Sequence, residues 1–287
     1  MTAKSLLKSL VPQSAWKEAA RRRRELQRAI SLRRVHYQGT EIDAHVGLCD
    51  GYEGKRILEV GACPSGRTVA RFKKIHGARE VVGVNIALQA AEVLSIDCRL
   101  EPIDARNTPY PDNYFDLVYS TSAFEHIHRL DLLLAEMHRV LRPGGRLFSH
   151  FGPIWSGSYG HHLWLKHKGI IHNYWNTKLP PYCHLLMTPE TLTHHCLKLY
   201  DEELTKMLVE YVFSSKEQNQ YFFEDYVGFV ENSNFRPIYF KGYDHPELAS
   251  RYTAKPFADT INLLLKKYSP KKQFLYDGIE LLLEKIA

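Results

Sequence analysis

The sequence lacks the features that mark membrane-spanning, secreted and zinc-binding proteins. None of its apolar runs approaches the roughly 18 residues of a membrane span, and the apolar stretch near its start is too short for a secretory signal. Its five cysteines form no CxxC pair, which indicates reduced thiols without a structural zinc. We therefore expect a cytoplasmic protein with no transmembrane segment and no bound metal.

Positive charge is scarce outside the start of the chain. The net charge is +6, yet residues 1–34 alone hold ten Lys or Arg against two Glu, so the remainder is slightly acidic. Apolar residues return at three- and four-residue steps in "WKEAARRRRELQRAISLRR", which predicts a basic helical arm over residues 1–40. A solvated helix covering one end of the fold is the simpler interpretation. The alternative is an anionic partner, RNA or a membrane surface, bound through residues 17–34.

What the chain does have is a regular alternation of strand and helix patterns. With 287 residues, 44% of them hydrophobic, it can bury one large core and carry an insertion. Strand patterns cover 55–62, 79–86, 98–105, 114–121, 145–152, 234–243 and 274–285, and helix patterns cover 66–76, 87–96, 131–141 and 257–268. This alternation predicts parallel βαβ units in an α/β, Rossmann-like, doubly wound and mostly parallel seven-stranded sheet.

One stretch interrupts the alternation. Residues 151–235, inside a domain expected to cover 41–287, are rich in aromatics and histidines. We expect them to form an inserted cap beside the carboxyl ends of the strands, where open α/β sheets bind ligands. A helix is predicted to begin at Thr188, with Pro189 in its first turn.

Glycine and polar residues occur where the first strands are expected to end. The first strand runs into "LEVGACPSG", in which Gly61 and Gly66 let a ligand approach the backbone closely. No lysine follows as in a P-loop, so a small cationic ligand near Glu59 is a better interpretation than a phosphate. At the end of the second strand, Asn85 can hydrogen-bond a ribose diol. At the end of the third, Asp104 can accept a hydrogen bond from an adenine amino group.

These stretches together resemble one family. The pieces "ILEVGACPSG", "VVGVNI", "PIDARNTPYPDNYFDLVYSTSAFEHI" and "EMHRVLRPGGRL" are similar, in order and spacing, to the cofactor half of class I S-adenosylmethionine-dependent methyltransferases. The similarity covers residues 55–150, and "YDGIELLLEK" resembles the family's last strand. Two positions depart from the family pattern: Cys63 replaces the middle glycine of the loop, and Asn85 stands where the family usually has an acid. The resemblance implies S-adenosylmethionine as the cofactor.

The resemblance also implies which residues meet that cofactor. The glycine loop should line its methionine side, the ends of the second and third strands its ribose and adenine, and the end of the fourth strand its sulfonium. The implied residues are Glu59, Gly61, Ala62, Gly66, Asn85, Ile86, Asp104, Ala105, Ser120 and Thr121.

The acceptor side is predicted from histidines. Methyl transfer needs an aligned acceptor and, for a hydroxyl, a base that takes its proton; histidine suits that task. We expect His161 or His162 to be this base, with Tyr159 as a helper, against the alternative that both histidines only pack. His126, after the fourth strand, is a further candidate for which a structural role is favoured.

A metal site is the other interpretation of these histidines. Residues 151–200 hold seven of the 15 histidines and three of the four tryptophans, a concentration that favours an acceptor pocket. Adjacent histidines rarely meet one ion, and no carboxylate cluster accompanies them in the sequence, so a metal is disfavoured. The ligands would come from His161, His162, His167, His172, His184 and Cys183.

The predicted function is transfer of a methyl group from S-adenosylmethionine to a small-molecule acceptor. A hydroxyl oxygen is favoured because it gives a histidine base a task. Three alternatives stay open: an RNA or protein methyltransferase guided by the basic arm, a carbon or nitrogen methyltransferase that needs no base, and a non-catalytic cofactor-binding or scaffold protein.

Overall fold

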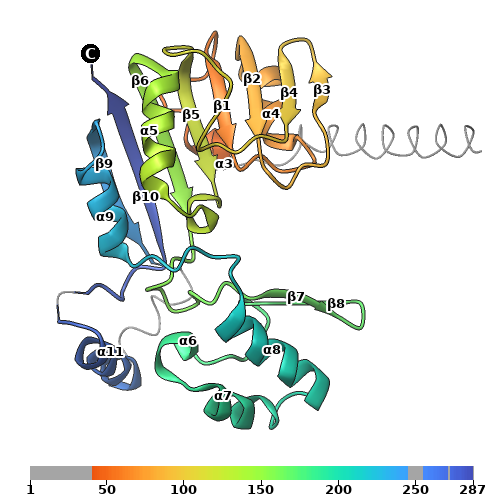
Figure 1. The fold of residues 1–287 in the computed structure, drawn as a ribbon, viewed down its shortest axis with the longest axis vertical. Coiled ribbons are helices and arrows are strands. Elements are labelled where there is room, and N and C mark those ends of the chain that lie inside the picture. Colours follow the sequence, from red (N-terminus) through yellow and green to blue (C-terminus); the bar gives the residue numbers. More distant parts are fainter. Residues whose placement is uncertain (1–40, 245–254, 271, 287) are drawn as a thin grey trace, which may run out of the picture.

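The computed structural model describes residues 41–244, 255–270 and 272–286, so the arm predicted over residues 1–40 lies outside the described residues. Figure 1 shows a sheet with helices on both faces and a smaller lobe beyond one end of its strands. The strands are β1 (Arg56–Val60), β2 (Glu80–Val84), β3 (Glu92–Ser95), β4 (Cys98–Glu101), β5 (Phe115–Thr121), β6 (Leu141–Phe151), β7 (Trp164–His167), β8 (Ile170–Asn173), β9 (Phe235–Tyr243) and β10 (Gly278–Lys285). The helices are α3 (Glu41–Ala44), α4 (Arg67–Lys74), α5 (Leu130–Val140), α6 (Cys183–Leu186), α7 (Pro189–Cys196), α8 (Glu202–Ser214), α9 (Phe223–Glu231), α11 (Lys255–Lys267) and the 3₁₀ turn η1 (Phe124–His126).

The main sheet confirms the predicted α/β class. Within the described part of the chain it holds eight strands in the order β3-β4-β2-β1-β5-β6-β10-β9. Strands β4, β2, β1, β5 and β6 run parallel, while β10 is antiparallel to both of its neighbours. The crossover helices between parallel strands give the doubly wound arrangement.

The eighth strand corrects one prediction. A helix was predicted over residues 87–96, and a seven-stranded sheet followed from it. That segment instead holds β3, which pairs antiparallel with β4 at the edge of the sheet. The segment includes a β-branched residue, Val93, and hydrogen bonds to an otherwise open sheet edge outweigh the helix propensity of its alanines and leucines.

Each face of the sheet buries its own apolar cluster. On one face α5 and α9 contribute Met137 and Tyr226, and on the other α3 and α4 contribute Ile42 and Phe72. These side chains are almost fully buried, and each contributes about 1.5–3 kcal/mol of burial free energy. The sheet is thereby held between two layers, with the carboxyl ends of its parallel strands facing the smaller lobe (Figure 1).

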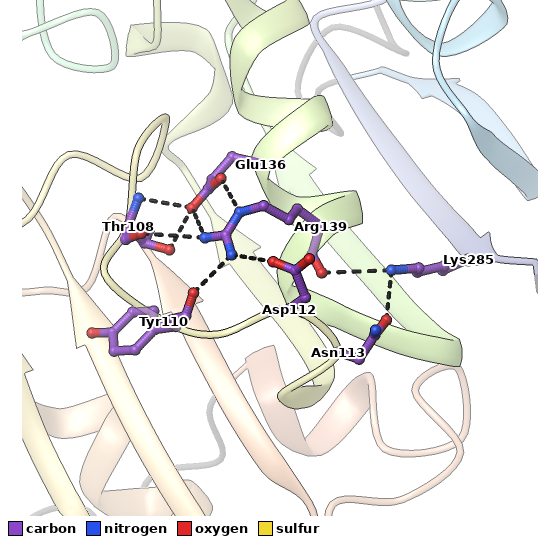
Figure 2. Close-up of polar contacts among 7 residues, drawn as sticks. All are labelled: Thr108, Tyr110, Asp112, Asn113, Glu136, Arg139 and Lys285. Carbon is purple, nitrogen blue, oxygen red and sulfur yellow. Dashed lines mark hydrogen bonds and ion pairs between the residues drawn. The ribbon is translucent and has the colours of Figure 1, made fainter.

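A polar network fastens the connection between β4 and β5 to α5, as Figure 2 shows. Arg139 is its centre: its guanidinium donates to both Glu136 oxygens and, at 2.6 Å, to Asp112. It also donates to the carbonyls of Thr108 and Tyr110. Glu136 in turn accepts from the backbone N–H and the hydroxyl of Thr108. The connection that leaves the end of β4 is therefore fixed along much of its length.

Residues 152–222 build the smaller lobe beyond the carboxyl ends of the strands (Figure 1). It holds the hairpin β7–β8 and helices α6 to α8 around an apolar cluster of its own. As predicted, α7 follows Thr188, whose side chain accepts from the Thr191 N–H, with Pro189 at its start. The N–H of Phe223 donates to the Ser156 hydroxyl at 3.2 Å, so the chain leaves the lobe next to where it entered.

The region after the lobe returns to the sheet. Helix α9 packs on the same face as α5 and leads into β9, and α11 packs against α6. In the described residues, no helix combines the length and the apolar character that crossing a bilayer requires.

Candidate functional site

The loop between β1 and α4 turns sharply at two glycines. Gly61 has a φ of +80°, and Gly66, which precedes α4, has a φ of +65°. The Gly61 N–H donates to the Val84 carbonyl at 2.9 Å, which ties the loop to the end of β2. A Cβ on Gly61 would lie 2.3 Å from the Ala123 Cβ. Glycine is therefore required where the loop approaches the turn after β5.

Asn85, which departs from the family pattern, holds this loop in place. Its side-chain N–H donates to the Ala62 carbonyl at 3.1 Å. Its side-chain oxygen accepts from the Ala87 N–H at 2.9 Å. An aspartate at this position has no proton to donate at neutral pH, so the amide does here what the family's acid cannot.

A cavity of about 330 Å³ opens at the carboxyl ends of β1, β2 and β4. Five of the ten residues expected to meet a cofactor line it: Gly61, Asn85, Ile86, Asp104 and Ala105. The Ile86 residue is 72% exposed at the cavity wall. An apolar side chain left open beside a cavity is suited to cover the face of a flat ring.

Asp104 is ionised and oriented at this wall. Arg106 donates to its carboxylate through the guanidinium, at 2.7 and 3.0 Å, and through the backbone N–H, at 2.9 Å. These bonds hold the pKa of Asp104 below its ordinary value. The carboxylate remains partly exposed, so it can also accept a hydrogen bond from a ligand.

The other five expected residues lie outside the cavity wall that the described residues form. Glu59 is buried in β1, and burial raises the pKa of Glu59 to about 8 against the opposing hydrogen bond from Thr68. Ser120 donates to the Val60 carbonyl at 3.0 Å. Both side chains are therefore part of the buried strands and not of the cavity wall. The five residues are Glu59, Ala62, Gly66, Ser120 and Thr121.

The two adjacent histidines have different surroundings. His161 is buried, its Nδ1 accepts from the Leu163 N–H at 3.2 Å, and burial lowers the pKa of this imidazole well below its ordinary value. The His162 ring stacks on the His126 ring, 4.7 Å between centroids, and His126 lines the cavity. Burial lowers the pKa of His162 to about 3. Tyr159 meets the His161 ring edge-on. The structure thus places His162, and not His161, one ring away from the cavity.

The site contains a carboxylate that the sequence reasoning passed over. Glu125 in η1 is completely buried; its Oε1 accepts from the Gly152 N–H at 3.3 Å, and its Oε2 has no hydrogen-bond partner. Burial raises the pKa of Glu125 to about 8. One carboxylate oxygen of Glu125 and one ring nitrogen each of His126 and His162 lie within 4.8 Å of one another. The sequence indicated only part of this group, the adjacent Glu125 and His126 that follow the fourth strand as "EH".

The lobe fixes η1 through Asn219. Its side-chain N–H groups donate to the carbonyls of Phe124, at 2.7 Å, and Ile127, at 3.1 Å, and its backbone N–H donates to the Glu125 carbonyl. The Tyr226 hydroxyl donates to its side-chain oxygen. A buried residue of the inserted lobe therefore determines where Glu125 and its neighbour stand.

The histidine metal site, which the sequence analysis gave as a disfavoured alternative, finds little support in this geometry. Of the six candidate ligands from the lobe, His162 alone belongs to a group of His, Cys, Asp or Glu side chains close enough to share an ion, among the residues that the structure describes.

A mostly parallel sheet in this strand order, with a glycine loop after β1 and a cavity across the ends of β1, β2 and β4, defines a class: the class I S-adenosylmethionine-dependent methyltransferases. Residues 58–149 match the family described as "Methyltransferase domain". This part of the chain is a methyltransferase domain of that class, and its cofactor is S-adenosylmethionine. The close approach at Gly61 and the open Ile86 at the cavity fit such a ligand.

Curated relatives support the same class over part of their length. The chain is 35% identical over 103 residues to Methyltransferase GfsG of Streptomyces halstedii, covering 33% of this chain and 36% of that protein. It is 34% identical over 114 residues to a demethylmenaquinone methyltransferase of Thermus thermophilus, covering 37% and 51%. The chain thus spans between about a third and a half of these relatives.

A solved S-adenosylmethionine-dependent methyltransferase from Mesorhizobium loti aligns with 84% of this chain and 96% of its own, at 14% identity and a TM-score of 0.49. At that score it adds nothing to what the strand order shows.

Proposed function

We propose that the protein transfers a methyl group from S-adenosylmethionine to a small-molecule acceptor. The observation that carries the proposal is the cavity at the strand ends, where five residues that the family resemblance assigns to the cofactor come together. The inserted lobe lies beyond the same strand ends, and the contact of its His162 ring with His126 at the cavity places it where it can hold an acceptor and exclude water.

The chain's own residues suit each part of this cofactor. Ile86 and Ala105 offer apolar surface to the adenine ring, and the Asp104 carboxylate can accept from its amino group. Asn85 keeps one lone pair of its oxygen for a ribose hydroxyl, while its N–H holds the glycine loop. When bound, the cofactor supplies a methyl carbon already activated by the adjoining sulfonium.

We propose further that the acceptor atom is a hydroxyl oxygen and that His162 receives its proton. The oxygen forms a bond to the methyl carbon as the carbon–sulfur bond breaks, the sulfur leaves as a neutral thioether, and the proton goes to the imidazole. His162 is chosen over His161 because its ring stacks on a residue that lines the cavity. Tyr159 supports His161 and thereby the turn that carries both histidines.

A carbon acceptor is the second candidate. The observation that favours it is the Thermus relative, which is named for demethylmenaquinone. The aromatic side chains gathered in the lobe would suit an apolar, ring-bearing molecule of either kind.

Calorimetric titration with S-adenosylmethionine and S-adenosylhomocysteine tests the cofactor half of the proposal. Ile86→Asp should weaken binding about tenfold or more, because it removes the apolar contact with the adenine ring. Ile96→Asp is the matched control, since Ile96 is 84% exposed and lies outside the cavity wall. Absence of binding to either ligand, or equal losses in the two variants, would overturn the proposal.

Methyl-transfer assays on a panel of hydroxyl and carbon acceptors test the base. His162→Asn should lower kcat by about 100-fold on a hydroxyl acceptor, while His161→Asn should leave kcat near that of the wild type. Full activity of the His162 variant would remove this residue from the chemistry and favour the carbon acceptor.

A further inference from the structure

We infer that Glu125, His126 and His162 form a binding site for a divalent transition-metal cation of the Zn²⁺ class, at the border between the cofactor cavity and the inserted lobe. His126 lines the cavity, and the other two residues lie behind it. Two come from η1 at the end of β5, and the third comes from the lobe, so the site exists only in the folded chain.

The ligand atoms are already gathered. They lie within 4.8 Å of one another, whereas ligands bound to one zinc at about 2.0–2.1 Å stand roughly 3.3 Å apart in a tetrahedron. A small shift of the exposed His126 side chain that keeps its Nδ1 at the Glu217 carbonyl would supply the remaining approach. The backbone of η1, which Asn219 holds, does not need to move.

Two of these side chains carry buried polar atoms without partners. Glu125 is completely buried, and its Oε2 accepts no hydrogen bond; the Nδ1 of His162 is likewise buried and unbonded. A buried polar atom left unpaired costs about 1–3 kcal/mol, so native proteins keep few such atoms. A cation between them would satisfy both.

The surrounding bonds orient the ligands as metal sites require. The Nδ1 of His126 lies 2.7 Å from the Glu217 carbonyl, so it must carry the proton and donate, which leaves the lone pair on Nε2. The Tyr211 hydroxyl, which donates to the Glu217 carboxylate, also lies 3.2 Å from the carbonyl of His162. Backbone carbonyls that fix the tautomer of a ligating histidine are the usual outer contacts of such sites.

His162 has an unusual backbone conformation. Its φ is +48°, in the left-handed region that residues other than glycine rarely adopt and that costs on the order of 1 kcal/mol. That conformation brings its ring onto the ring of His126.

The donor set selects the cation. Two imidazole nitrogens and one carboxylate favour Zn²⁺, Fe²⁺ or Co²⁺, whereas Mg²⁺ and Ca²⁺ prefer oxygen ligands only. Three protein ligands leave a coordination position open, as in catalytic sites.

This role rests on the proposed function and refines it. A hydroxyl that meets the open position would lose its proton more readily, because the positive charge of the cation lowers the pKa of a bound hydroxyl. With the cation bound, the lone pair of His162 is used by the metal and the acceptor proton passes to solvent, so that the proton transfer to His162 proposed above belongs to the metal-free protein.

A second group with the same composition provides a control. His45, His150 and Glu280 also come close together, on the face of the sheet that α3 covers. There, however, Glu280 is paired with Lys241 at 2.9 Å, and the Nδ1 of His45 bonds the Tyr119 hydroxyl at 2.8 Å. Glu280 and His45 therefore have partners of their own without an ion.

The test is titration of the full-length protein, freed of metal with a chelator, with Co²⁺ and Zn²⁺. The visible absorption of Co²⁺ reports imidazole and carboxylate coordination, and calorimetry gives the affinity for Zn²⁺. We expect a single equivalent to bind, with affinity reduced about tenfold or more in Glu125→Gln and His126→Asn and unchanged in His45→Asn. Because His126 is exposed, its variant keeps the fold even if the Glu125 variant does not.

Two results would overturn the inference: no Co²⁺ absorption in the wild type, or a loss of binding in His45→Asn with none in the other two variants. The proposed function fails separately. A protein that binds S-adenosylmethionine and methylates a hydroxyl acceptor at full rate in the presence of chelator keeps its function and loses the metal site.

Discussion

The contact between Gly61 and Ala123 yields the sharpest prediction. The structure gives both the direction of the stability change in Gly61→Ala and the residue that the new side chain would meet. Gly61→Ala would place a Cβ 2.3 Å from the Ala123 Cβ, with only the Ala123 Cα also within 4 Å among the described atoms outside the neighbouring residues. It would also put a side chain at a φ of +80°. The left-handed backbone costs about 1–2 kcal/mol, and the overlap about 1–3 kcal/mol.

Removing the opposing methyl group separates these two costs. Ala123→Gly alone should lower the unfolding free energy by about 1–2 kcal/mol, through a lost buried methyl and a freer backbone. Combined with Gly61→Ala, it should recover the overlap, so that the double variant is about 1–3 kcal/mol more stable than the sum of the single effects predicts. Of the two costs of Gly61→Ala, only that of the left-handed backbone should then remain, in addition to the cost of Ala123→Gly itself.

Urea denaturation of the four proteins measures this coupling, and titration with S-adenosylmethionine shows whether the same contact positions the loop for the cofactor. We expect affinity to fall in Gly61→Ala and to return in part in the double variant. A Gly61→Ala protein as stable as the wild type, or single effects that simply add, would show that the loop does not stand where we describe it.

Three further predictions concern the support of the site. Asn85→Asp loses the bond donated to the Ala62 carbonyl and should lower the unfolding free energy by about 1–2 kcal/mol in urea denaturation; unchanged stability would show that this bond contributes nothing. The pKa of Glu59 rises on folding from 4.5 to about 8, so the native state holds an extra proton between these values and stability falls as pH rises through that window. From about pH 5 to about pH 7.5, the unfolding free energy of the wild type should therefore fall by roughly 3 kcal/mol relative to that of Glu59→Gln. If the unfolding free energies of the two proteins change equally with pH, the raised pKa of Glu59 is contradicted. Arg139→Lys loses the planar guanidinium and should lower the unfolding free energy by about 1–2 kcal/mol and weaken cofactor binding. Arg142→Lys, at a more exposed ion pair, is the control and should change the unfolding free energy by less than about 0.5 kcal/mol. Equal effects of the two variants in urea denaturation would refute the importance of the Arg139 network.

The sequence predicted most of the sheet because its parallel strands are buried on both faces and read as apolar runs between helix patterns. It failed at β3, a four-residue edge strand that pairs with β4, with Val93 in it and Ile96 directly after it exposed. An edge strand of this kind has no continuous apolar run, and its pairing depends on a neighbour that only the fold supplies.

For the candidate site, the sequence located the residues at the strand ends and missed what the lobe adds. Gly61, Asn85 and Asp104 follow their strands directly, so their meeting at one edge of a parallel sheet is a matter of topology. Glu125 and His162 stand 37 positions apart, and no local pattern indicates that a buried carboxylate meets a neutral imidazole. The departure from the family pattern at Asn85 has a structural role that the sequence did not indicate, because the amide makes a bond that an acid cannot make.

The adjacent entry and exit of the lobe have a consequence for how such a protein changes over time. Residues 152–222 depart from the end of β6 and return within a hydrogen bond of their start, through Ser156 and Phe223. Lengthening or shortening a loop closed at such a neck costs only about 0.6 kcal/mol per doubling of its length. One continuous piece of chain can thus be replaced by another without disturbing the sheet. The residues of the lobe are then free to diverge, while the residues at the strand ends stay the same.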